Sequence, residues 1–330
     1  MVTLKDIADK AHVTVSTVSK ALNGNLTISE KKRKEIFKIA DDLGYIPTAR
    51  NRVFKKTNLI GILVPELQSP FFVQLISNLE SILIANGYIP LLYVSDTDTE
   101  QEEKGFQLFI EKNANGIFYI IPSSQNAEQM VSDAAEKYGI HTVMIYPTSS
   151  VSCSSVIIDE TAVMKQLLEL LLEKGYSRIG FISDMFIRNF RYKNFLETLQ
   201  ILGGSVSEAE KYSAFSEHRY AQGGYEAIEK LYTVGCFPDA LISGSDIFTI
   251  GAMRFAADQK IYIPKDLALA SFDNITFAPY LYPSLTTIAH PFQEIAEVSY
   301  QLLTDINKRR GTSCVHTVTL QPKLIIRESV

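Results

Sequence analysis

Residues 4–25, LKDIADKAHVTVSTVSKALNGN, decide how the start of the chain folds. Apolar residues at helical spacing predict a first helix in this stretch: Leu4, Ile7, Ala8 and Ala11. Thr3 followed by Asp6 resembles a capping box in which Asp replaces the usual Glu, and such a pair marks where a helix begins. The sequence therefore predicts a short helix that ends at a break near His12.

A second helix is expected after this break, with Thr14 as its N-cap. The inward stripe of this helix consists of Val18, Ala21 and Leu22. The outward face carries Ser16, Thr17, Ser19, Lys20 and Asn23. Because small hydroxyl and amide side chains let a helix lie deep in the major groove of DNA, this face can bind base edges and phosphates.

A third helix is expected between Ser29, its cap, and Gly44, which can end it with a positive φ. Three short helices with a tight turn between the first two fit a helix-turn-helix. Periodicity alone also fits other small helical bundles.

Charge separates the start of the chain from the rest. Residues 1–56 hold twelve Lys and Arg against six Asp and Glu, whereas the other 274 residues hold 20 basic and 31 acidic side chains. A cationic head on an acidic body suits a polyanionic partner, since phosphate neutralisation releases counterions and steers encounter.

The quoted stretch, followed by LGYIP at residues 43–47, closely resembles the head of the LacI/GalR family of repressors. The resemblance implies that Val15, Ser16 and Lys20 read bases, although Val15 could extend the apolar stripe and Lys20 could contact phosphate. Residues 46–56, IPTARNRVFKK, resemble the family's hinge helix, with Phe54 where a Leu wedges into the minor groove; Phe54 could instead pack on the body. The expected DNA contacts are Thr3, Thr14, Val15, Ser16, Thr17, Ser19, Lys20, Asn23, Arg50, Phe54 and Lys55.

From residue 59 the chain alternates β-rich runs with helical stretches, in two successive series. This alternation predicts two parallel sheets flanked by helices, and a ligand site in the cleft between their facing edges. In the second series, helices are expected near 160–174, 192–202, 224–231 and 247–258.

The resemblance to the family continues through GYSRIGFIS (175–183), SGSDIFTIGAM (243–253), IPKDLALASFDN (263–274) and YPSLTTIAHP (282–291). It implies an all-α helix-turn-helix head (1–45), a hinge and linker (46–58) and a two-lobed α/β periplasmic-binding-protein-like type I domain (59–330). The first lobe would comprise about 59–158 and 289–316. The second would comprise about 159–288 and 317–330.

The same match places six residues around an effector in the cleft: Phe71, Phe72, Tyr146, Arg191, Asp246 and Asp273. An arginine fork with carboxylate acceptors can bind a polyhydroxylated ligand, and aromatic rings can stack on a sugar or purine face. The two Phe residues could equally be core residues. Arg188 could replace Arg191, or Arg191 could form an ordinary surface ion pair.

The expected partners are a pseudopalindromic double-stranded operator, a second copy of the chain and a small metabolite. A sugar or sugar derivative is the first choice of metabolite, before a purine or a phosphoprotein co-regulator. No heptad-bearing tail follows PKLIIRESV, which disfavours a tetramer built by such a tail.

Other function classes fit the sequence less well. The motifs GxSxG, GxxxxGK[ST], GxGxxG and HExxH are missing, so no enzyme and no cofactor are expected. Cys153, Cys236 and Cys314 form no CxxC, so neither a metal site nor a disulfide is expected. With no membrane span or signal segment expected, the protein is predicted to be cytoplasmic, and a basic head argues against an extracytoplasmic sugar-binding protein.

Overall fold

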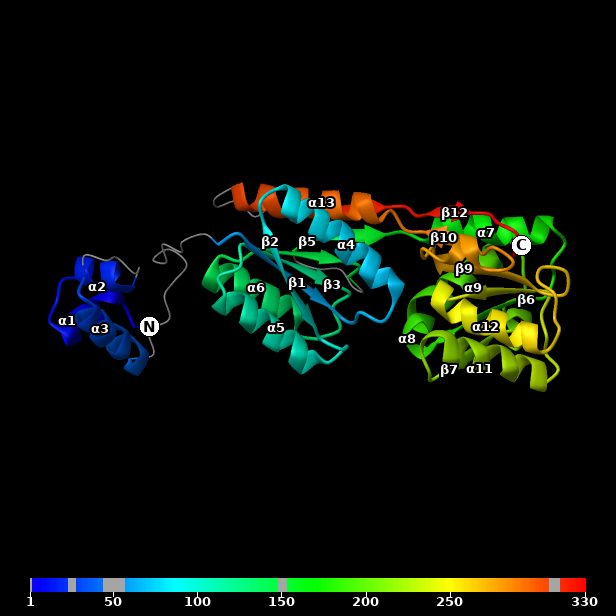
Figure 1. The fold of residues 1–330 in the computed structure, drawn as a ribbon, viewed down its shortest axis with the longest axis horizontal. Helices are drawn as coiled ribbons and strands as arrows, with labels where there is room; N and C mark the ends of the chain where they lie inside the picture. The colour runs from blue at the N-terminus through cyan, green and yellow to red at the C-terminus, as the bar shows by residue number, and fades with distance from the viewer. Residues whose placement is uncertain (1, 23–27, 44–56, 148–152, 309–314) are drawn as a thin grey trace.

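The computed structural model describes residues 2–22, 28–43, 57–147, 153–308 and 315–330. Three helices form the head: α1 (Leu4–Ala11), α2 (Val15–Leu22) and α3 (Glu30–Asp42). The body that follows has two lobes arranged side by side (Figure 1). In the described residues, no helix is both long and apolar enough to cross a membrane.

The caps predicted from the sequence set the starts of the first two helices. The Thr3 hydroxyl accepts a hydrogen bond from the Asp6 amide, and the Asp6 carboxylate accepts one from the Thr3 amide at 2.7 Å. The Thr17 amide donates to Thr14 Oγ1 at 3.1 Å, which caps α2. Between these helices His12 adopts φ 54°, the left-handed conformation that ends α1. The helices pack on a core of Ile7, Ala8, Ala11, Val18, Ala21, Ile36 and Ala40.

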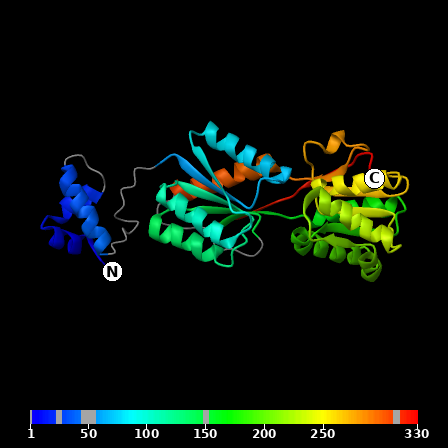
Figure 2. The ribbon, with the colours of Figure 1, turned by 60° about the horizontal axis from the view of Figure 1, so that its bottom comes forward.

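The first lobe is a six-stranded parallel sheet in the order β11-β5-β4-β3-β1-β2. Its strands are β1 (Leu59–Val64), β2 (Ile89–Val94), β3 (Gly116–Ile120), β4 (Thr142–Ile145), β5 (Ser154–Ile158) and β11 (Thr317–Leu320). Helices α4 (Pro70–Ala85) and α13 (Phe292–Lys308) cover one face, and α5 (Thr99–Glu111) and α6 (Ala127–Tyr138) cover the other (Figure 2).

The second lobe has a six-stranded sheet in the order β12-β10-β9-β8-β6-β7, parallel except for β12. Its strands are β6 (Ile179–Asp184), β7 (Ala214–Ser216), β8 (Ala240–Ser243), β9 (Ala268–Asp273), β10 (Thr286–Ala289) and β12 (Lys323–Ile325). Helices α7 (Thr161–Glu173) and α9 (Lys193–Ile201) cover one face, and α11 (Tyr220–Thr233) and α12 (Asp246–Asp258) the other. Shorter helical segments are α8 (Met185–Ile187), η1 (Arg188–Tyr192), α10 (Val206–Lys211) and η2 (Ala278–Tyr280).

The chain crosses between the lobes three times: after β5, after β10 and after β11. The first crossing follows Ile158 and the second follows Ala289. The third crossing, predicted near residue 316, lies four residues later, because β11 pairs in parallel with β5 in the first lobe before β12 joins the second. The predicted fold class, a helical head followed by two parallel α/β lobes, is confirmed. The predicted hinge helix, residues 46–56, lies outside the described residues.

Candidate functional site

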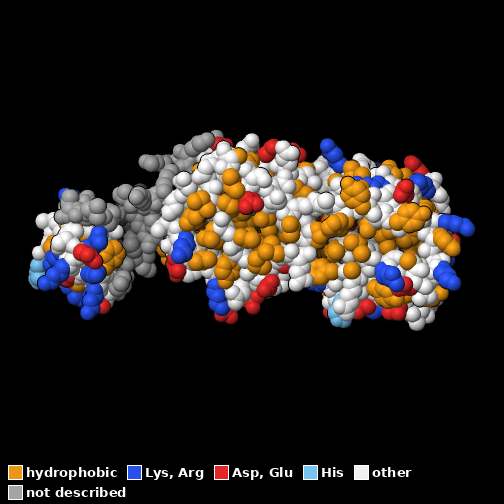
Figure 3. All heavy atoms as spheres, viewed as in Figure 1, with side chains coloured by type: hydrophobic (Ala, Val, Ile, Leu, Met, Phe, Trp, Pro, Cys, Tyr) orange, Lys and Arg blue, Asp and Glu red, His pale blue; other side chains and the backbone are white. Residues whose placement is uncertain are grey.

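Helix α2 presents polar side chains on its outward face. Thr14, Ser16 and Lys20 are exposed, and Thr17 and Ser19 are partly exposed. Val15 is 44% exposed, whereas Val18 and Ala21 are fully buried in the head core. Val15 therefore does not extend the apolar stripe and is accessible to a partner. Figure 3 shows Lys and Arg side chains on the visible face of the head.

The other predicted DNA contacts are only partly placed. Thr3 is exposed at the start of α1, where its hydroxyl donates to Asp6 Oδ2 at 2.7 Å. Asn23, Arg50, Phe54 and Lys55 lie outside the described residues, so the minor-groove wedge stays a prediction.

A cavity of about 220 Å³ lies between the two lobes, at the carboxyl ends of their strands. This is the position at which parallel α/β sheets bind ligands. Five of the six predicted effector residues line it: Phe71, Phe72, Tyr146, Arg191 and Asp273. Phe71 and Phe72 also belong to the core of the first lobe, so their lining and packing roles coexist.

The first-lobe wall of the cavity is mainly apolar. It consists of Phe71, Phe72, Ile121, Tyr146, Pro147, Ile157 and Ile158, with Glu66 and Ser69 as its other members. The second-lobe wall carries most of the charge, in Glu160, Asp184, Arg191, Arg219 and Asp273. This wall also contributes aromatic and apolar side chains, those of Phe186, Ile187, Phe190, Tyr220 and Ile247. Both walls therefore offer apolar surface, and the second-lobe wall adds charged groups.

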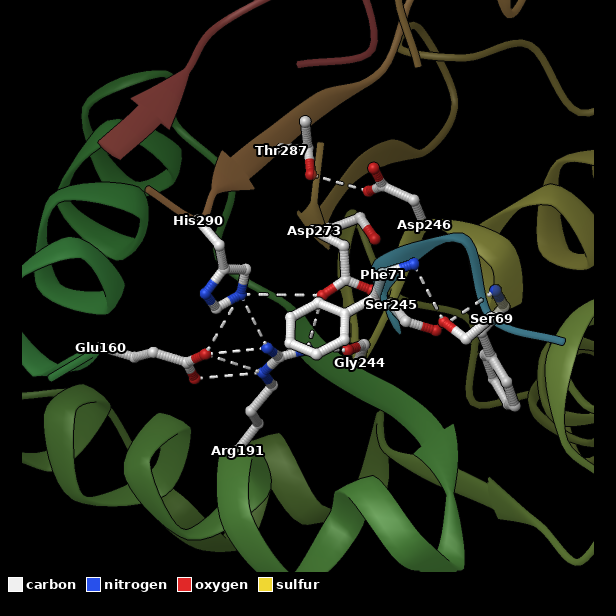
Figure 4. A network of polar contacts seen from close by, with 12 residues as sticks. Ser69, Phe71, Glu160, Arg191, Gly244, Ser245, Asp246, Asp273, Thr287 and His290 are labelled. Carbon is white, nitrogen blue, oxygen red and sulfur yellow. Dashed lines mark hydrogen bonds and ion pairs between the residues drawn. The ribbon is translucent and has the colours of Figure 1, made fainter. Parts of the chain in front are cut away.

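Arg191, on η1, is the centre of a buried polar network (Figure 4). Its guanidinium donates to Glu160 in a bidentate pair, to the Gly244 carbonyl at 2.6 Å and to Asp273 Oδ1 at 3.3 Å. It also lies 4.2 Å from the centroid of the Phe272 ring. Arg188 instead lies over Phe215, so of these two neighbouring arginines it is Arg191 that reaches the cavity. Its donors are largely engaged within the protein, unlike those of a surface ion pair.

His290, on the second crossing, connects this network to the first lobe. Arg191 Nη2 lies 3.0 Å from His290 Nε2, and Tyr146 Oη lies 3.0 Å from His290 Nδ1. Because a guanidinium can only donate, Nε2 accepts and the imidazole proton resides on Nδ1. His290 then donates to Tyr146, whose own hydroxyl proton is left to donate elsewhere. Burial lowers the pKa of His290 well below its usual value, which agrees with a neutral ring.

The two predicted aspartates differ in position. Asp273 lines the cavity, and burial raises its pKa to about 6 although Arg191 opposes the shift. Asp246 was expected in the cleft, but it is fully buried behind the lining residues Ser245 and Ile247. Its carboxylate accepts from the Ile275 amide at 2.8 Å and from Thr287 Oγ1 at 2.7 Å. Asp246 therefore ties α12 to the strand ends of the second sheet.

A second group of polar side chains, which the sequence did not reveal, also joins the two lobes. Glu66, after β1, accepts from the Tyr220 hydroxyl at 2.8 Å and from Arg219 Nη2 at 3.4 Å. Asp184, at the end of β6, also lines the cavity and lies 3.9 Å from Arg219 Nε. The position of Asp184 at the end of a strand could have marked it as a cavity residue from the sequence alone. The contact between Glu66 and Arg219 could not be predicted in this way, because it depends on how the two lobes face each other.

In the described residues, no group of three or more His, Cys, Asp and Glu side chains could hold a metal ion. Cys153 and Cys236 are free thiols, and Cys314 is outside these residues.

Comparisons with known proteins agree with both parts of the structure. Residues 3–48 match the model for bacterial regulatory proteins of the lacI family, and residues 168–330 match the periplasmic binding protein-like domain. The HTH-type transcriptional repressor PurR of Yersinia pestis bv. Antiqua (strain Antiqua) is 28% identical over 339 residues, covering 100% of this chain and 97% of its own. Catabolite control protein A of Staphylococcus xylosus is 27% identical over 306 residues, or 92% of each chain.

Among solved structures, the complex of the transcriptional regulator CelR with cellobiose superimposes with a TM-score of 0.72. It covers 100% of both chains at 22% identity, which supports the same fold from head to second lobe.

Proposed function

Because the chain belongs to the LacI family of DNA-binding transcriptional regulators, a non-enzymatic family, we propose that it is a homodimeric repressor controlled by a small metabolite. The head binds a pseudopalindromic operator, one half-site for each subunit. The metabolite binds in the cavity between the lobes. Since its partner is genomic DNA, the protein works in the cytoplasm.

The observation that carries the DNA-binding proposal is the outward face of α2. Its exposed residues Val15, Ser16 and Lys20 are short or flexible enough to approach base edges, while Val18 and Ala21 fix the helix from behind. An apolar side chain such as Val15 suits contact with a thymine methyl, and Lys20 suits guanine or phosphate. Small hydroxyl groups beside them can bind the phosphates that fix the register.

The test is fluorescence anisotropy of a labelled duplex from the region upstream of the protein's own gene, measured across a salt series. Lys20→Ala should weaken binding about tenfold or more and, if Lys20 contacts phosphate, reduce the salt slope by about one. Lys165→Ala, an exposed lysine on α7 outside the head, is the control and should bind as the wild type does. Equal affinity of Lys20→Ala and wild type would remove Lys20 from the contact set.

For the metabolite, a carbohydrate or sugar derivative has the best support. The cavity combines aromatic rings with carboxylate and guanidinium groups, which is the chemistry of sugar sites. The structurally similar CelR was solved with cellobiose. A solute-binding protein without DNA function is the alternative, and it predicts sugar binding with no affinity for any duplex.

Control of DNA binding follows from the position of the cavity. An occupant touches residues of both lobes, so it stabilises one relative arrangement of the lobes over others. Such an occupant changes operator affinity only by the difference between its affinities for the two arrangements. The sign of the change, induction or co-repression, depends on which arrangement the operator-bound dimer prefers.

A further inference from the structure

The Glu66 carboxylate makes a direct contact between the two lobes. Its Oε2 accepts a hydrogen bond from the Tyr220 hydroxyl at 2.8 Å, and its Oε1 accepts one from Arg219 Nη2 at 3.4 Å. Glu66 follows β1 in the first lobe, whereas Tyr220 begins α11 in the second lobe, 154 residues later in the chain. These bonds therefore join the lobes through space and not through the crossing segments.

The first lobe holds the Glu66 carboxylate in a fixed position. Glu66 is 5% exposed, and its Oε2 also accepts from the backbone amides of Gln68 at 2.7 Å and Ser69 at 3.0 Å. A side chain that is already ordered loses little further freedom when another donor binds to it. The first lobe thus presents a preorganised acceptor to the second.

The second lobe fixes the turn that carries Arg219 and Tyr220. The Glu226 carboxylate accepts from Ser216 Oγ at 2.6 Å and from His218 Nδ1 at 2.9 Å. These hydrogen bonds lower the pKa of Glu226 to about 2, so this carboxylate stays ionised and keeps its bonds to the turn. Both partners of the contact between the lobes are therefore held by their own lobe.

Tyr220 has an unusual backbone conformation. Its φ is 59°, in the left-handed region that residues with bulky side chains rarely adopt. Such a conformation is unfavourable and persists where surrounding contacts hold it. In this conformation the hydroxyl reaches Glu66, and the ring lies against the Arg219 guanidinium, whose carbon is 4.9 Å from the ring centroid. Burial and the bond to Glu66 raise the pKa of Tyr220 to about 12, so the hydroxyl keeps the proton that it donates.

We propose that Glu66, Arg219 and Tyr220 form a latch, which holds the lobes in the closed arrangement, with Glu66 against Tyr220, before any metabolite binds. A hydrogen bond from a hydroxyl to a carboxylate is charge-assisted and about twice as strong as a neutral one. A metabolite that prefers another arrangement of the lobes must break this contact, so the latch sets the difference in affinity that control requires. That consequence rests on the proposed function, whereas the latch itself does not.

The test measures how often the lobes separate, from the accessibility of a thiol in the cavity. Ser245, on the second lobe, lines the cavity and is 4% exposed, so Ser245→Cys gives a thiol that the closed lobes shield. This parent variant is made in the full-length chain and labelled with N-ethylmaleimide, with no metabolite added. Mass spectrometry of its peptides separates the new thiol from the native cysteines. The same reaction in urea gives the rate without shielding.

Removing the latch should speed the labelling, because the rate follows the population of separated lobes. Tyr220→Phe, which removes only the hydroxyl, should raise the rate about tenfold. Glu66→Gln keeps an oxygen for the backbone amides but loses the charge, and should raise the rate about fivefold. The double variant should label no more than about twice as fast as the faster single variant, because both changes remove one contact.

Tyr225→Phe is the matched control. Tyr225 lies on the same helix as Tyr220, and its hydroxyl donates to Asp258 at 3.5 Å within the second lobe. The variant should label at the parent rate, because it removes a hydroxyl without touching the contact between the lobes.

Three results would overturn the latch. The first is a Tyr220→Phe rate within about twofold of the parent rate. The second is labelling of the parent at its urea rate while its circular dichroism matches that of the wild type, since the lobes would then separate freely. The third is a double variant whose effect equals the product of the single effects, since the two residues would then act independently.

The latch and the proposed function can fail separately. The labelling experiment contains no DNA, so a wild-type chain that binds no duplex would remove the regulator and leave the latch intact. An unchanged labelling rate in Tyr220→Phe would remove the latch and leave operator binding intact.

Discussion

Replacing Arg191 with Met tests whether the buried ion pairs of this residue stabilise the second lobe. The Arg191 side chain is 12% exposed, and its removal leaves Glu160 and Asp273, whose side chains are 16% and 5% exposed, without their cation. Breaking a buried ion pair on one side destabilises a protein by about 3–5 kcal/mol. We expect the lower end, about 3 kcal/mol at pH 7.5, because Glu160 can turn toward solvent.

The same variant should show a diagnostic dependence on pH. Burial raises the pKa of Asp273 to about 6 while Arg191 opposes the rise, so removing Arg191 raises this pKa further. A folded-state pKa above the unfolded value adds stability at low pH, and this contribution is lost as the pH rises through the folded-state pKa. The loss caused by Arg191→Met should therefore be smaller at pH 5.5 than at pH 7.5.

The assay is urea unfolding followed by far-ultraviolet circular dichroism at both pH values, because the chain has no tryptophan. Arg178→Met is the control: Arg178 pairs with Asp239 at the surface of the same lobe and is 53% exposed, so its loss should be below about 1 kcal/mol. A loss of less than about 1 kcal/mol for Arg191→Met, or an equal loss at the two pH values, would refute the reasoning.

Three further variants test the structure elsewhere. Burial raises the pKa of Asp246 to about 7, so the contribution of Asp246 to wild-type stability should be lost as pH rises from about 4 to 7. Asp246→Asn should remove this contribution, so the free energy of unfolding measured by urea titration should fall less or rise more over this pH range than in the wild type; the same pH dependence in both proteins would contradict the effect assigned to Asp246. Gly224→Ala should lower the thermal midpoint by several degrees, because a Cβ there would lie 1.7 Å from the Phe248 carbonyl oxygen; a wild-type midpoint would show that α11 can shift freely. Glu102→Ala should lower the free energy of unfolding in urea by about 3 kcal/mol, because the buried Glu102 carboxylate accepts hydrogen bonds from Tyr119 and from two serine amides. Replacing its exposed neighbour, Glu103→Ala, is the control and should leave this free energy nearly unchanged. Equal losses in the two variants would contradict this account.

Local signals in the sequence were sufficient for the head. Thr3 with Asp6 and Thr14 with Thr17 act within one helical turn, so their spacing alone predicts the hydrogen bonds that the structure shows. The exposure of Val15 required the structure, because an apolar residue at a helix start fits either face.

Features that depend on contacts between elements were less predictable. Helix α11 was expected at 224–231, but it spans Tyr220–Thr233, because Gly223 and Gly224 allow close approach of neighbouring backbone instead of ending the helix. Asp246 follows a strand end like a cleft residue, yet α12 begins there and turns its carboxylate toward Thr287. The third crossing shifted because the pairing of β11 with β5 cannot be read from β11 alone.

Arg219 shows the limit most clearly. Nothing in the local sequence distinguishes it from an exposed arginine at a helix start, and its role emerges only when Glu66 from the first lobe and Asp184 from β6 lie beside it. The identity of a ligand in a cavity between lobes therefore depends on side chains that are distant in sequence.

The most direct test of the central claim is the affinity of the full-length protein for its upstream duplex, measured by anisotropy with and without a sugar shown by calorimetry to saturate the cavity. The account predicts that saturation changes operator affinity by about fivefold or more. Operator affinity that stays the same at full saturation of the wild-type cavity would contradict the claim that this cavity controls DNA binding.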